Sequence, residues 1–582
     1  MRGRISNRAG LILLGVAAAV TLHAETWTTI TTGWRPNRIT VAGDLIWASS
    51  TGGLYRIDPV AEEVDFWNKD QSLFSNVLNV VEANPVGGEL WVGYADAAVD
   101  RIDPATGEVI QRILDFNQAT EIFEVYDITF DGEEAYVATD IGVSRMVPLE
   151  DEDLYVVQET YRRFGGWEQP IKILNVAMYR DTLYAGGELG LAFAGKEENL
   201  FEANSWNTLA IEDHFFDGED PDLPYINEIL PVGDDLYICS YEVGAFVKEG
   251  STYEPLDTRR RTVYTVVSGP NGTLYGGLFA GLFTYSPDDN QWQEVSEFDQ
   301  KVFDLVLSES TGNLWAALDT DIKYSGRIGR YNESDGWLIY PSNTPGGNEV
   351  SALNCSPDGS IWASALGVAG RTVNRYKDGM WTVWSKLNVD APFFGYTHIS
   401  IEFDGWGGTW IASRGNGLLY IEGDSTWTYL NADSSEYISR LEEDNPFTLI
   451  ADFARDPGGG FWITNPGGLD ELPLLYLPPA WFQGIEAPWL RFGNFGGILQ
   501  NDVAEIEVDS LGRIWLAATQ VREDIALLRM DPGESIEDRS DDTYLHYIPS
   551  EIGLAADGLI RSLLLASDGV LWIGTSEGLY YL

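Results

Sequence analysis

A short pattern that recurs twelve times along the chain restricts its fold more than any other feature. In each copy an aromatic residue near the start is followed by apolar and then small residues, as in Leu571-Trp-Ile-Gly-Thr575. A turn between Gly574 and Gly578 leads from the last copy to a second apolar run, Leu579–Leu582. Aromatic and β-branched residues favour strands, and glycine tolerates the positive φ of a tight turn. Each copy therefore predicts one strand of a β-hairpin.

The twelve copies are 38 to 57 residues apart, and many are preceded by a strand-like run and a turn. Their first residues are Leu45, Leu90, Ala135, Leu183, Leu236, Leu274, Leu314, Ile361, Thr409, Phe461, Ile514 and Leu571. Four antiparallel strands every 40 to 50 residues are typical of a propeller blade. No stretch keeps a helical period, which argues against α/β folds. The sequence predicts an all-β protein.

Twelve blades exceed the usual four to eight of one ring, so we expect two β-propellers of about six or seven four-stranded blades each. We place the first at residues 25–290 and the second at 291–582, because some later repeats have longer connections between their second and third strands. The strand expected at Trp27 could close the first ring, with a strand around Trp292 closing the second. If one propeller is inserted in the other, Trp27 closes the final blade instead.

Residues 1–24 predict a signal peptide. Arg2, Arg4 and Arg8 precede an apolar stretch, Leu11–Leu22, which is too short to span a bilayer. Ala24 offers a cleavage site, so the mature chain is expected to begin near Glu25. We therefore expect export in a bacterium, to the periplasm or the cell surface.

The chain is strongly acidic, with 90 Asp and Glu against 36 Lys and Arg and a formal net charge of −54. Such a surface repels nucleic acid and anionic lipid. Either salty surroundings or a cationic partner would suit it. With 21 Trp and 13% aromatic residues, the composition is that of a folded chain with a large core.

Motifs that carry chemistry are scarce. The mature histidines, His214, His398 and His546, lie in different repeats without metal-site spacing. Cys239 and Cys355, also in different repeats, predict two unlinked buried thiols. The sequence has no nucleophile elbow, zinc-protease motif or phosphate loop. We expect no cofactor, no metal and no catalytic residue, and we interpret Asp-Gly pairs as β-turns.

Two segments stand out as candidate binding sites. The connection after the tenth repeat is rich in aromatic residues, which suit sugar stacking or partner docking if they are exposed. Its candidate residues are Trp481, Phe482, Trp489, Arg491, Phe492 and Phe495. The alternative is that part of this segment is a blade's fourth strand. The second candidate is the cationic run Arg259, Arg260 and Arg261, which could hold a carboxylate or phosphate or be a solvated strand start. A further segment, Pro392–Tyr396, is interpreted as a blade-to-blade connection.

Tryptophan occupies the second position of the repeat seven times: Trp91, Trp315, Trp362, Trp410, Trp462, Trp515 and Trp572. Repeated geometry implies a repeated environment. We expect these side chains to pack between adjacent blades and not to contact a ligand.

The final repeat resembles the two-component-regulator propeller repeat of bacterial sensor proteins. The first hundred residues are similar to the opening blades of the PorZ family of the type IX secretion system, in Ser50-Thr-Gly-Gly-Leu-Tyr55 and Leu90–Ile102. Family members carry a C-terminal sorting domain, whereas this chain ends within its last blade and has no kinase or transmembrane segment. The resemblance thus implies a recognition platform at the envelope, for a glycan or for secretion partners.

Our main hypothesis is an exported, non-enzymatic double propeller that binds a glycan or protein partner at the cell envelope. One alternative is a propeller enzyme, a polysaccharide lyase or glycoside hydrolase, with a composite site at the axis. Another is a sensor that acts through a separate kinase. We expect no nucleic-acid partner and no membrane span in the mature chain.

Overall fold

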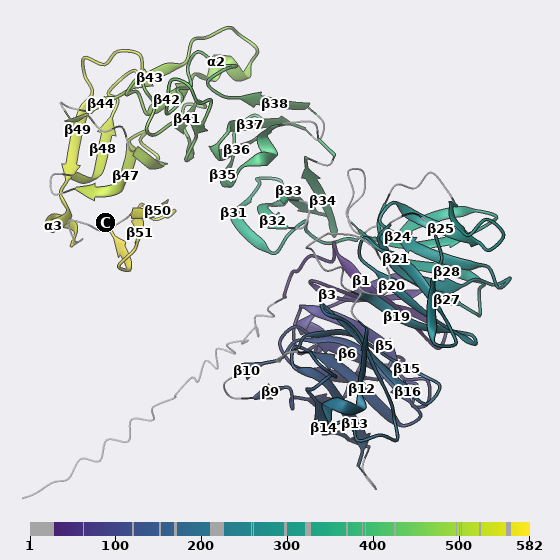
Figure 1. Ribbon diagram of the computed structural model, residues 1–582. Helices are drawn as coiled ribbons and strands as arrows, with labels where there is room; N and C mark the ends of the chain where they lie inside the picture. Colours follow the sequence, from purple (N-terminus) through teal and green to yellow (C-terminus); the bar gives the residue numbers. More distant parts are fainter. Residues whose placement is uncertain are drawn as a thin grey trace, which may run out of the picture.

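The computed structural model is built almost entirely from β-strands, arranged as twelve successive antiparallel sheets (Figure 1). The structure describes residues 28–582 except 62, 119–120, 150–152, 168–170, 210–225, 258, 260, 296–299, 320–326, 341, 368–369, 387, 390–391, 424–425, 496–497, 500, 502, 523–524 and 554–559. Each sheet is a meander of consecutive strands. The prediction of an all-β propeller fold is confirmed.

The first seven blades have four strands each, ordered from the axis outward. Blades 1 to 3 are β1 (Pro36–Ala42), β2 (Leu45–Ser50), β3 (Gly53–Asp58) and β4 (Glu63–Trp67); β5 (Leu78–Ala83), β6 (Leu90–Tyr94), β7 (Val99–Ile102) and β8 (Val109–Ile113); β11 (Val125–Asp131), β12 (Glu134–Thr139), β13 (Gly142–Pro148) and β14 (Tyr155–Tyr161). Blades 4 to 7 are β15 (Ile173–Tyr179), β16 (Thr182–Gly187), β17 (Gly190–Gly195) and β18 (Asn207–Leu209); β19 (Ile226–Val232), β20 (Asp235–Ser240), β21 (Gly244–Glu249) and β22 (Thr252–Pro255); β23 (Val263–Ser268), β24 (Leu274–Leu278), β25 (Gly281–Ser286) and β26 (Gln291–Glu294); β27 (Val302–Ser308), β28 (Asn313–Leu318), β29 (Arg327–Asn332) and β30 (Gly336–Tyr340).

The last five blades follow the same plan. Blade 8 consists of β31 (Glu349–Cys355), β32 (Ile361–Gly367), β33 (Gly370–Lys377) and β34 (Met380–Ser385), and blade 9 of β35 (His398–Phe403), β36 (Gly408–Gly415), β37 (Gly417–Glu422) and β38 (Thr426–Leu430), with β39 (Thr448–Leu449) paired to β36. Blade 10 consists of β40 (Phe453–Arg455), β41 (Phe461–Thr464), β42 (Leu474–Leu477) and β43 (Leu490–Phe492), and blade 11 of β46 (Val503–Val508), β47 (Ile514–Arg522), β48 (Ile525–Asp531) and β49 (Thr543–Tyr547). Blade 12 has three strands, β50 (Ile560–Leu565), β51 (Leu571–Thr575) and β52 (Leu579–Tyr581). Five short elements lie between blades: the hairpins β9 (Asn117–Gln118) with β10 (Glu121–Ile122) and β44 (Asn494–Phe495) with β45 (Ile498–Leu499), the 3-10 turns Lys69–Gln71 and Pro392–Gly395, and the helical turn α3 (Pro549–Ile552). The 3-10 turn Ala203–Ser205 and the helical turn α2 (Pro479–Phe482) connect the third and fourth strands of blades 4 and 10.

All twelve copies of the repeat form the second strand of their blades, the central position between the inner and third strands. Glycine opens the third strand in several blades because the turn before it requires a positive φ, as at Gly142 (127°) and Gly281 (134°). The repeat therefore marks each blade at its most buried strand.

Blades 1 to 7 form a closed ring. Each inner strand packs against the next, and β27 of blade 7 packs against β1 of blade 1. Trp315 and Tyr340 of blade 7 share a buried cluster with Ile46 of blade 1. At the axis, the Ile39 N–H donates to Asp304 Oδ2 at 2.8 Å. Side-chain packing and this polar contact close the ring, while each blade keeps its own four consecutive strands.

This closure changes the expected domain boundary. Residue 290 lies between the third and fourth strands of blade 6, and Trp292 sits in β26, where it is buried. The first propeller extends to Tyr340 because blade 7 fills the space between blades 6 and 1. Residues 28–35 form no strand, and Trp27 lies outside the described residues.

Blades 8 to 12 form an open arc in Figure 1, with β31 of blade 8 standing apart from β50 of blade 12. The face of blade 8 that precedes the arc exposes Val350 (54%) and Leu353 (66%), and Cys355 is exposed beside them. The two thiols are unlinked as expected, but only Cys239 is buried. Cys355 is exposed because the structure places no blade against this side of β31.

The segment before β1 fastens the two halves of the chain together. The Thr32 N–H donates to Asn348 Oδ1 at 2.7 Å, and the Gly33 N–H donates to Thr344 Oγ1 at 2.9 Å. Both acceptors lie in the connection between blades 7 and 8. Within the described part of the chain, no helix is long and apolar enough to cross a membrane.

Candidate functional site

The axial mouth of the first propeller is a pocket of about 280 Å³ to which all seven inner strands contribute. Its apolar wall comes from the rings of Tyr126, Tyr264 and Phe303. Tyr264 and Phe303 make an edge-to-face contact with ring centroids 5.1 Å apart. Aromatic rings around a hollow offer faces on which a sugar or a flat side chain can stack.

A repeated irregularity in the inner strands creates this mouth. Each inner strand of the ring shifts register near its second residue, as between Pro36 and Arg38 or Val125 and Asp127. A bulge turns the skipped residue away from the regular face of a strand. The skipped residues are Asn37, Asn79, Tyr126, Leu174, Asn227, Tyr264 and Phe303, and all seven line the pocket.

The asparagines of the mouth also hold neighbouring blades together. Their side-chain amides donate to main-chain carbonyls of the next inner strand at 2.7–3.0 Å: Asn37 to Leu78, Asn79 to Val125, Asn175 to Ile226 and Asn227 to Val263. The side-chain oxygens of Asn37 and Asn175 already accept from Ser49 and Arg38, at 2.7 and 3.1 Å. Within the described part of the chain, those of Asn79 and Asn227 accept no hydrogen bond and can accept one from a ligand. The mouth is therefore rigid before any ligand arrives.

Arg35 supplies the charge at the rim of the mouth. Its guanidinium lies over the Phe303 ring at 5.7 Å, its side chain is exposed, and no described carboxylate pairs with it. In a chain of net charge −54, an unpaired arginine beside three aromatic rings is a feature that the sequence did not single out. A guanidinium can bind an acidic group or hydroxyls of a ligand through its fork of donors.

Below the mouth lies a polar belt around Arg38. Arg38 Nη1 donates to Glu228 Oε1 at 2.7 Å, and Nη2 donates to Asn175 Oδ1 at 3.1 Å. Burial raises the pKa of Glu228 above its usual value, although Arg38 opposes this, and burial also raises the pKa of Asp127 to about 6. Asp127 accepts from the Val176 N–H at 2.9 Å, as Asp304 accepts from Ile39, so these acids tie blades together.

A second cleft runs along the axis of the open arc. It measures about 510 Å³ and is lined by the inner strands of blades 8 to 12. Four acids face it, and burial raises the pKa of each: Glu402, Asp452, Glu505 and Glu507, with Glu507 reaching about 7. Arg455 Nε pairs with Glu402 at 3.3 Å. Among the described residues, no cluster of three or more His, Cys, Asp or Glu could hold a metal ion.

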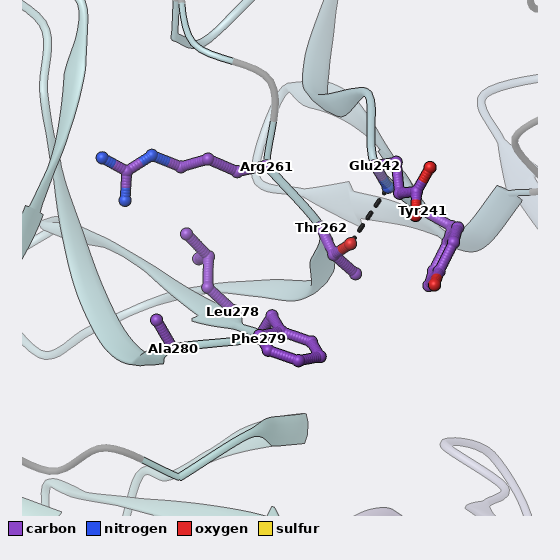
Figure 2. Close-up of a pocket in the computed structure, with 7 residues that line it drawn as sticks. All are labelled: Tyr241, Glu242, Arg261, Thr262, Leu278, Phe279 and Ala280. Atoms are coloured by element: carbon purple, nitrogen blue, oxygen red, sulfur yellow. Dashed lines mark hydrogen bonds between the residues drawn. The ribbon is translucent and has the colours of Figure 1, made fainter. Parts of the chain in front are cut away.

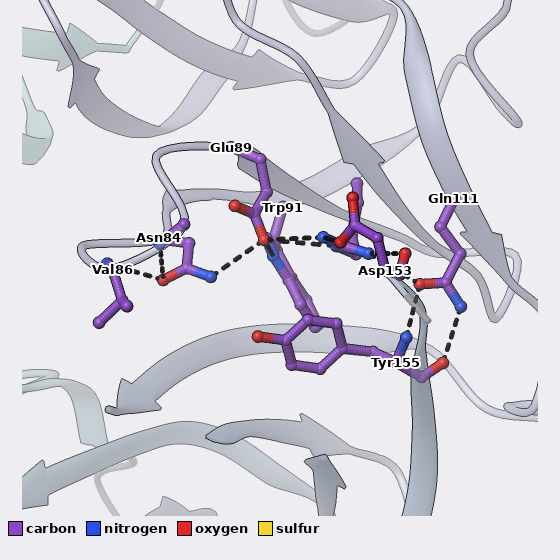
Figure 3. Close-up of polar contacts among 9 residues, drawn as sticks. Asn84, Val86, Glu89, Trp91, Gln111, Asp153 and Tyr155 are labelled. Carbon is purple, nitrogen blue, oxygen red and sulfur yellow. Dashed lines mark hydrogen bonds and ion pairs between the residues drawn. The ribbon is translucent and has the colours of Figure 1, made fainter. Parts of the chain in front are cut away.

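The opposite face of the first propeller carries a pocket of about 530 Å³ whose polar groups serve the fold. Figure 3 shows Glu89 accepting from Trp91 and Asn84, at 3.1 and 3.0 Å. Arg101 donates to Glu89 and to Asp153 and stacks on the Tyr155 ring. Burial raises the pKa of Glu89, but these hydrogen bonds and the charge of Arg101 outweigh it and lower the pKa. The network locks blades 2 and 3.

The aromatic connection after the tenth repeat is mostly buried. Leu490–Phe492 is the fourth strand of blade 10, so Arg491 and Phe492 lie on a strand, and Arg491 pairs with Asp470. Phe492 and Phe495 are buried between blades 10 and 11. The alternative of a blade's fourth strand therefore holds for Arg491 and Phe492, and Phe495 is buried as well.

The two tryptophans of that connection also pack inward. Trp489 is buried and stacks on Tyr437, with centroids 5.4 Å apart. Trp481 and Phe482, on α2, are partly buried against Trp410. The condition of exposure, under which these side chains would suit a ligand, is therefore not met by Trp489 and only partly met by Trp481 and Phe482.

One carboxylate partly neutralises the cationic run. Arg259 and Arg261 both pair with Asp257, at 3.2 and 3.4 Å, and Arg260 lies outside the described residues. His214 also lies outside them. His398 is buried beside Phe393 and Phe394 in the blade 8–9 connection, and His546 Nε2 lies 3.0 Å from the Phe495 carbonyl oxygen.

Comparisons with known proteins agree with this architecture. Residues 46–207 match the model of the PorZ N-terminal β-propeller domain of the type IX secretion system. The chain resembles PorZ. The solved structure of PorZ from Porphyromonas gingivalis, a surface component of that system, superposes with a TM-score of 0.72 at 17% identity, covering 96% of this chain and 73% of PorZ.

A second solved structure is described as the extracellular domain of a hybrid two-component system from B. thetaiotaomicron. It has 15% identity and a TM-score of 0.41, covering 95% of this chain and 69% of that one. No curated protein matches the chain in sequence. The PorZ likeness establishes the propeller fold, and the matched segment spans blades 1 to 4.

Proposed function

We propose that this chain is an exported, non-enzymatic PorZ-like propeller that binds a glycan at the cell envelope through the axial mouth of its first propeller. The observation that supports this proposal best is the mouth itself, where the Tyr126, Tyr264 and Phe303 rings surround a pocket with Arg35 at its rim. Stacking faces, amide oxygens and a guanidinium are the groups with which proteins bind sugars. PorZ is described as a bacterial surface component, and the leader-like residues 1–24 support the same location for this chain.

The test is a glycan array of bacterial envelope polysaccharides, probed with the mature chain and two variants. Phe303→Leu removes a stacking face, and Arg35→Gln removes the rim charge. Losing one such contact weakens binding by about tenfold, corresponding to about 1.4 kcal/mol. Trp406→Leu, which changes an exposed aromatic residue on blade 9, is the matched control and leaves binding unchanged. An array without binding, or binding that both mouth variants retain, would exclude this function.

The open-arc cleft favours a second candidate, acid–base cleavage of a polysaccharide. Carboxylic acids whose pKa values are raised into the neutral range are suited to act as general acids. Reducing-end release from envelope polysaccharides by the wild-type chain, abolished in Glu507→Gln, would support the enzyme. Unchanged polysaccharide after prolonged incubation would support binding alone.

A further inference from the structure

A second pocket lies on the same face of the first propeller, between blades 5 and 6, and measures about 450 Å³. It is bounded by the turns that follow β20 and β24 and by the segment that precedes β23. Figure 2 shows the side chains of Tyr241 and Phe279 on either side of Thr262, with Arg261 extending away from them. Phe279 exposes 56% of its surface, a high value for a residue next to a core strand.

Two other blades of the ring carry an ion pair where blade 6 has Thr262. The residue directly before the inner strand is Lys172 in blade 4 and Lys301 in blade 7. Lys172 pairs with Asp140 at 4.0 Å, and Lys301 pairs with Asp319 at 2.9 Å. Ion pairs thus occupy this position in those blades. In blade 6 the residue is Thr262, which is too short to fill the space.

The turns around Thr262 also differ from those of other blades, because an aromatic residue replaces an acidic one. The first residue after the second strand is Asp140 in blade 3, Glu188 in blade 4 and Asp319 in blade 7, but it is aromatic in blades 5 and 6. The pocket therefore combines two aromatic rings, Tyr241 and Phe279, with a threonine in place of a lysine. Arg261 also lines it, but its guanidinium pairs with Asp257 and lies over the Phe283 ring. Packing does not explain Phe279, since most of its surface is exposed.

Glu242 adds an uncompensated negative charge to this pocket. Its φ is +62°, an uncommon conformation for a residue other than glycine, and its N–H donates to Thr262 Oγ1 at 3.0 Å. Its carboxylate makes no ion pair or hydrogen bond with any residue that the structure describes. Strained residues held in place by their surroundings occur often at binding sites.

The Phe279 ring already lies against one cation. Lys301 Nζ lies 4.8 Å from the ring centroid. Because Lys301 is paired with Asp319, it brings little net charge to the pocket. Ammonium and guanidinium groups bind aromatic faces, and a nearby carboxylate strengthens the attraction. The net charge of −54 favours the approach of a basic partner over long distances.

We propose that the pocket formed by Tyr241, Glu242, Thr262 and Phe279 binds a lysine or arginine side chain of a protein partner. This site is independent of the axial mouth and of any glycan bound there. It gives the chain a means to hold a basic protein on the face that carries the mouth.

The test uses a blocked Gly-Lys-Gly tripeptide, and the same peptide with norleucine in place of lysine, titrated by calorimetry into the full chain. The buffer contains 0.3 M salt, which screens the long-range attraction between the acidic chain and the cationic peptide. The lysine peptide binds and the norleucine peptide does not. Glu242→Gln and Phe279→Leu each weaken binding by about tenfold, while Phe303→Leu at the axial mouth has no effect.

Matched controls separate the pocket from general charge. Glu254→Gln removes one exposed carboxylate from the same blade, and Phe201→Leu removes one exposed ring from the loop after blade 4's third strand. Neither change weakens binding. An equal loss from Glu254→Gln and Glu242→Gln would overturn the proposal, because the peptide would then sense only net charge. Binding of maltohexaose that Phe279→Leu abolishes, without binding of the lysine peptide, would also overturn it and assign the pocket to a sugar.

Discussion

Six of the seven tryptophans at the second position of the repeat pack against the following blade. Trp91, Trp362, Trp410, Trp462 and Trp515 are buried in clusters shared with the next blade, and Trp315 does the same toward blade 1. Trp572 is 36% exposed, because no blade covers that side of blade 12. The expectation that these residues pack between blades is confirmed for the first six.

This contrast provides a matched pair of substitutions. Trp410 is fully buried, and its indole N–H donates to Asp404 at 2.9 Å. Trp410→Ala should lower the free energy of unfolding of the second propeller by about 3–5 kcal/mol, as for other buried aromatic residues. Trp572→Ala should lower it by less than about 1 kcal/mol, because its surroundings are half open. Urea unfolding of both variants measures the difference, and equal losses would contradict it.

His398 provides a prediction about acid stability. It is fully buried, its Nδ1 lies 2.5 Å from Ser364 Oγ, and its ring stacks on Phe393. Burial, with a smaller effect of Arg371, lowers its pKa from 6.5 to about 4. The folded state therefore favours the neutral ring, and its stability falls as the pH drops from about 6.5 to about 4.

The shift in the pKa of His398 corresponds to a loss of stability on the order of 3 kcal/mol. Unfolding of the wild type and His398→Gln, measured at pH 7.5 and pH 4, checks it. The wild type should lose more stability than the variant on acidification. Parallel pH profiles would show that His398 is not the group responsible.

At the level of strands, the axis of the open arc gathers acids from neighbouring blades. Burial raises the pKa of Glu507 from 4.5 to about 7, and its Oε1 accepts from the Leu565 N–H at 3.2 Å. The folded state favours the protonated acid. The stability that protonated Glu507 contributes is therefore fully present below its unfolded pKa and is lost as the pH rises through about 7.

Glu507→Gln keeps the shape and an oxygen acceptor without the charge. The variant should become more stable than the wild type as the pH rises from about 4.5 to 8, by at most about 3 kcal/mol. Glu443→Gln, an exposed position in the same propeller, should leave the pH dependence unchanged. A wild type that stays as stable as Glu507→Gln at pH 8 would contradict the raised pKa.

For the whole molecule, a closed ring and an open arc made from the same repeat should differ in stability. The inner strand of blade 7 buries Val302 and Leu305, whereas that of blade 8 exposes Val350 and Leu353. Local opening requires less free energy where fewer apolar groups are buried. Hydrogen exchange should therefore be faster in β31 and β50 than in β1 and β27. Equal protection of the four strands would show that the exposed faces are covered in solution.

The sequence alone determined the parts of this protein that depend on local order. Each repeat carries its own strand and turn preferences, so the all-β class, the twelve blades and the buried tryptophans could be predicted from spacing and residue type. The Asp-Gly turns belong to the same group. Asp358, for example, accepts from the Ser360 N–H at 3.0 Å and pairs with Lys377.

Only the tertiary structure decided where the rings divide and where ligands can bind. Ile39 meets Asp304 across 265 residues, and Arg38 meets Glu228 across 190. A local pattern cannot indicate which distant blade will fill a gap, because closure depends on the shape of the space between inner strands. For the same reason the sequence left open whether the aromatic run around Trp489 is an exposed loop or a blade's fourth strand. The mouth at Phe303 gave no sequence signal, since the seven bulge residues that line it come one from each blade.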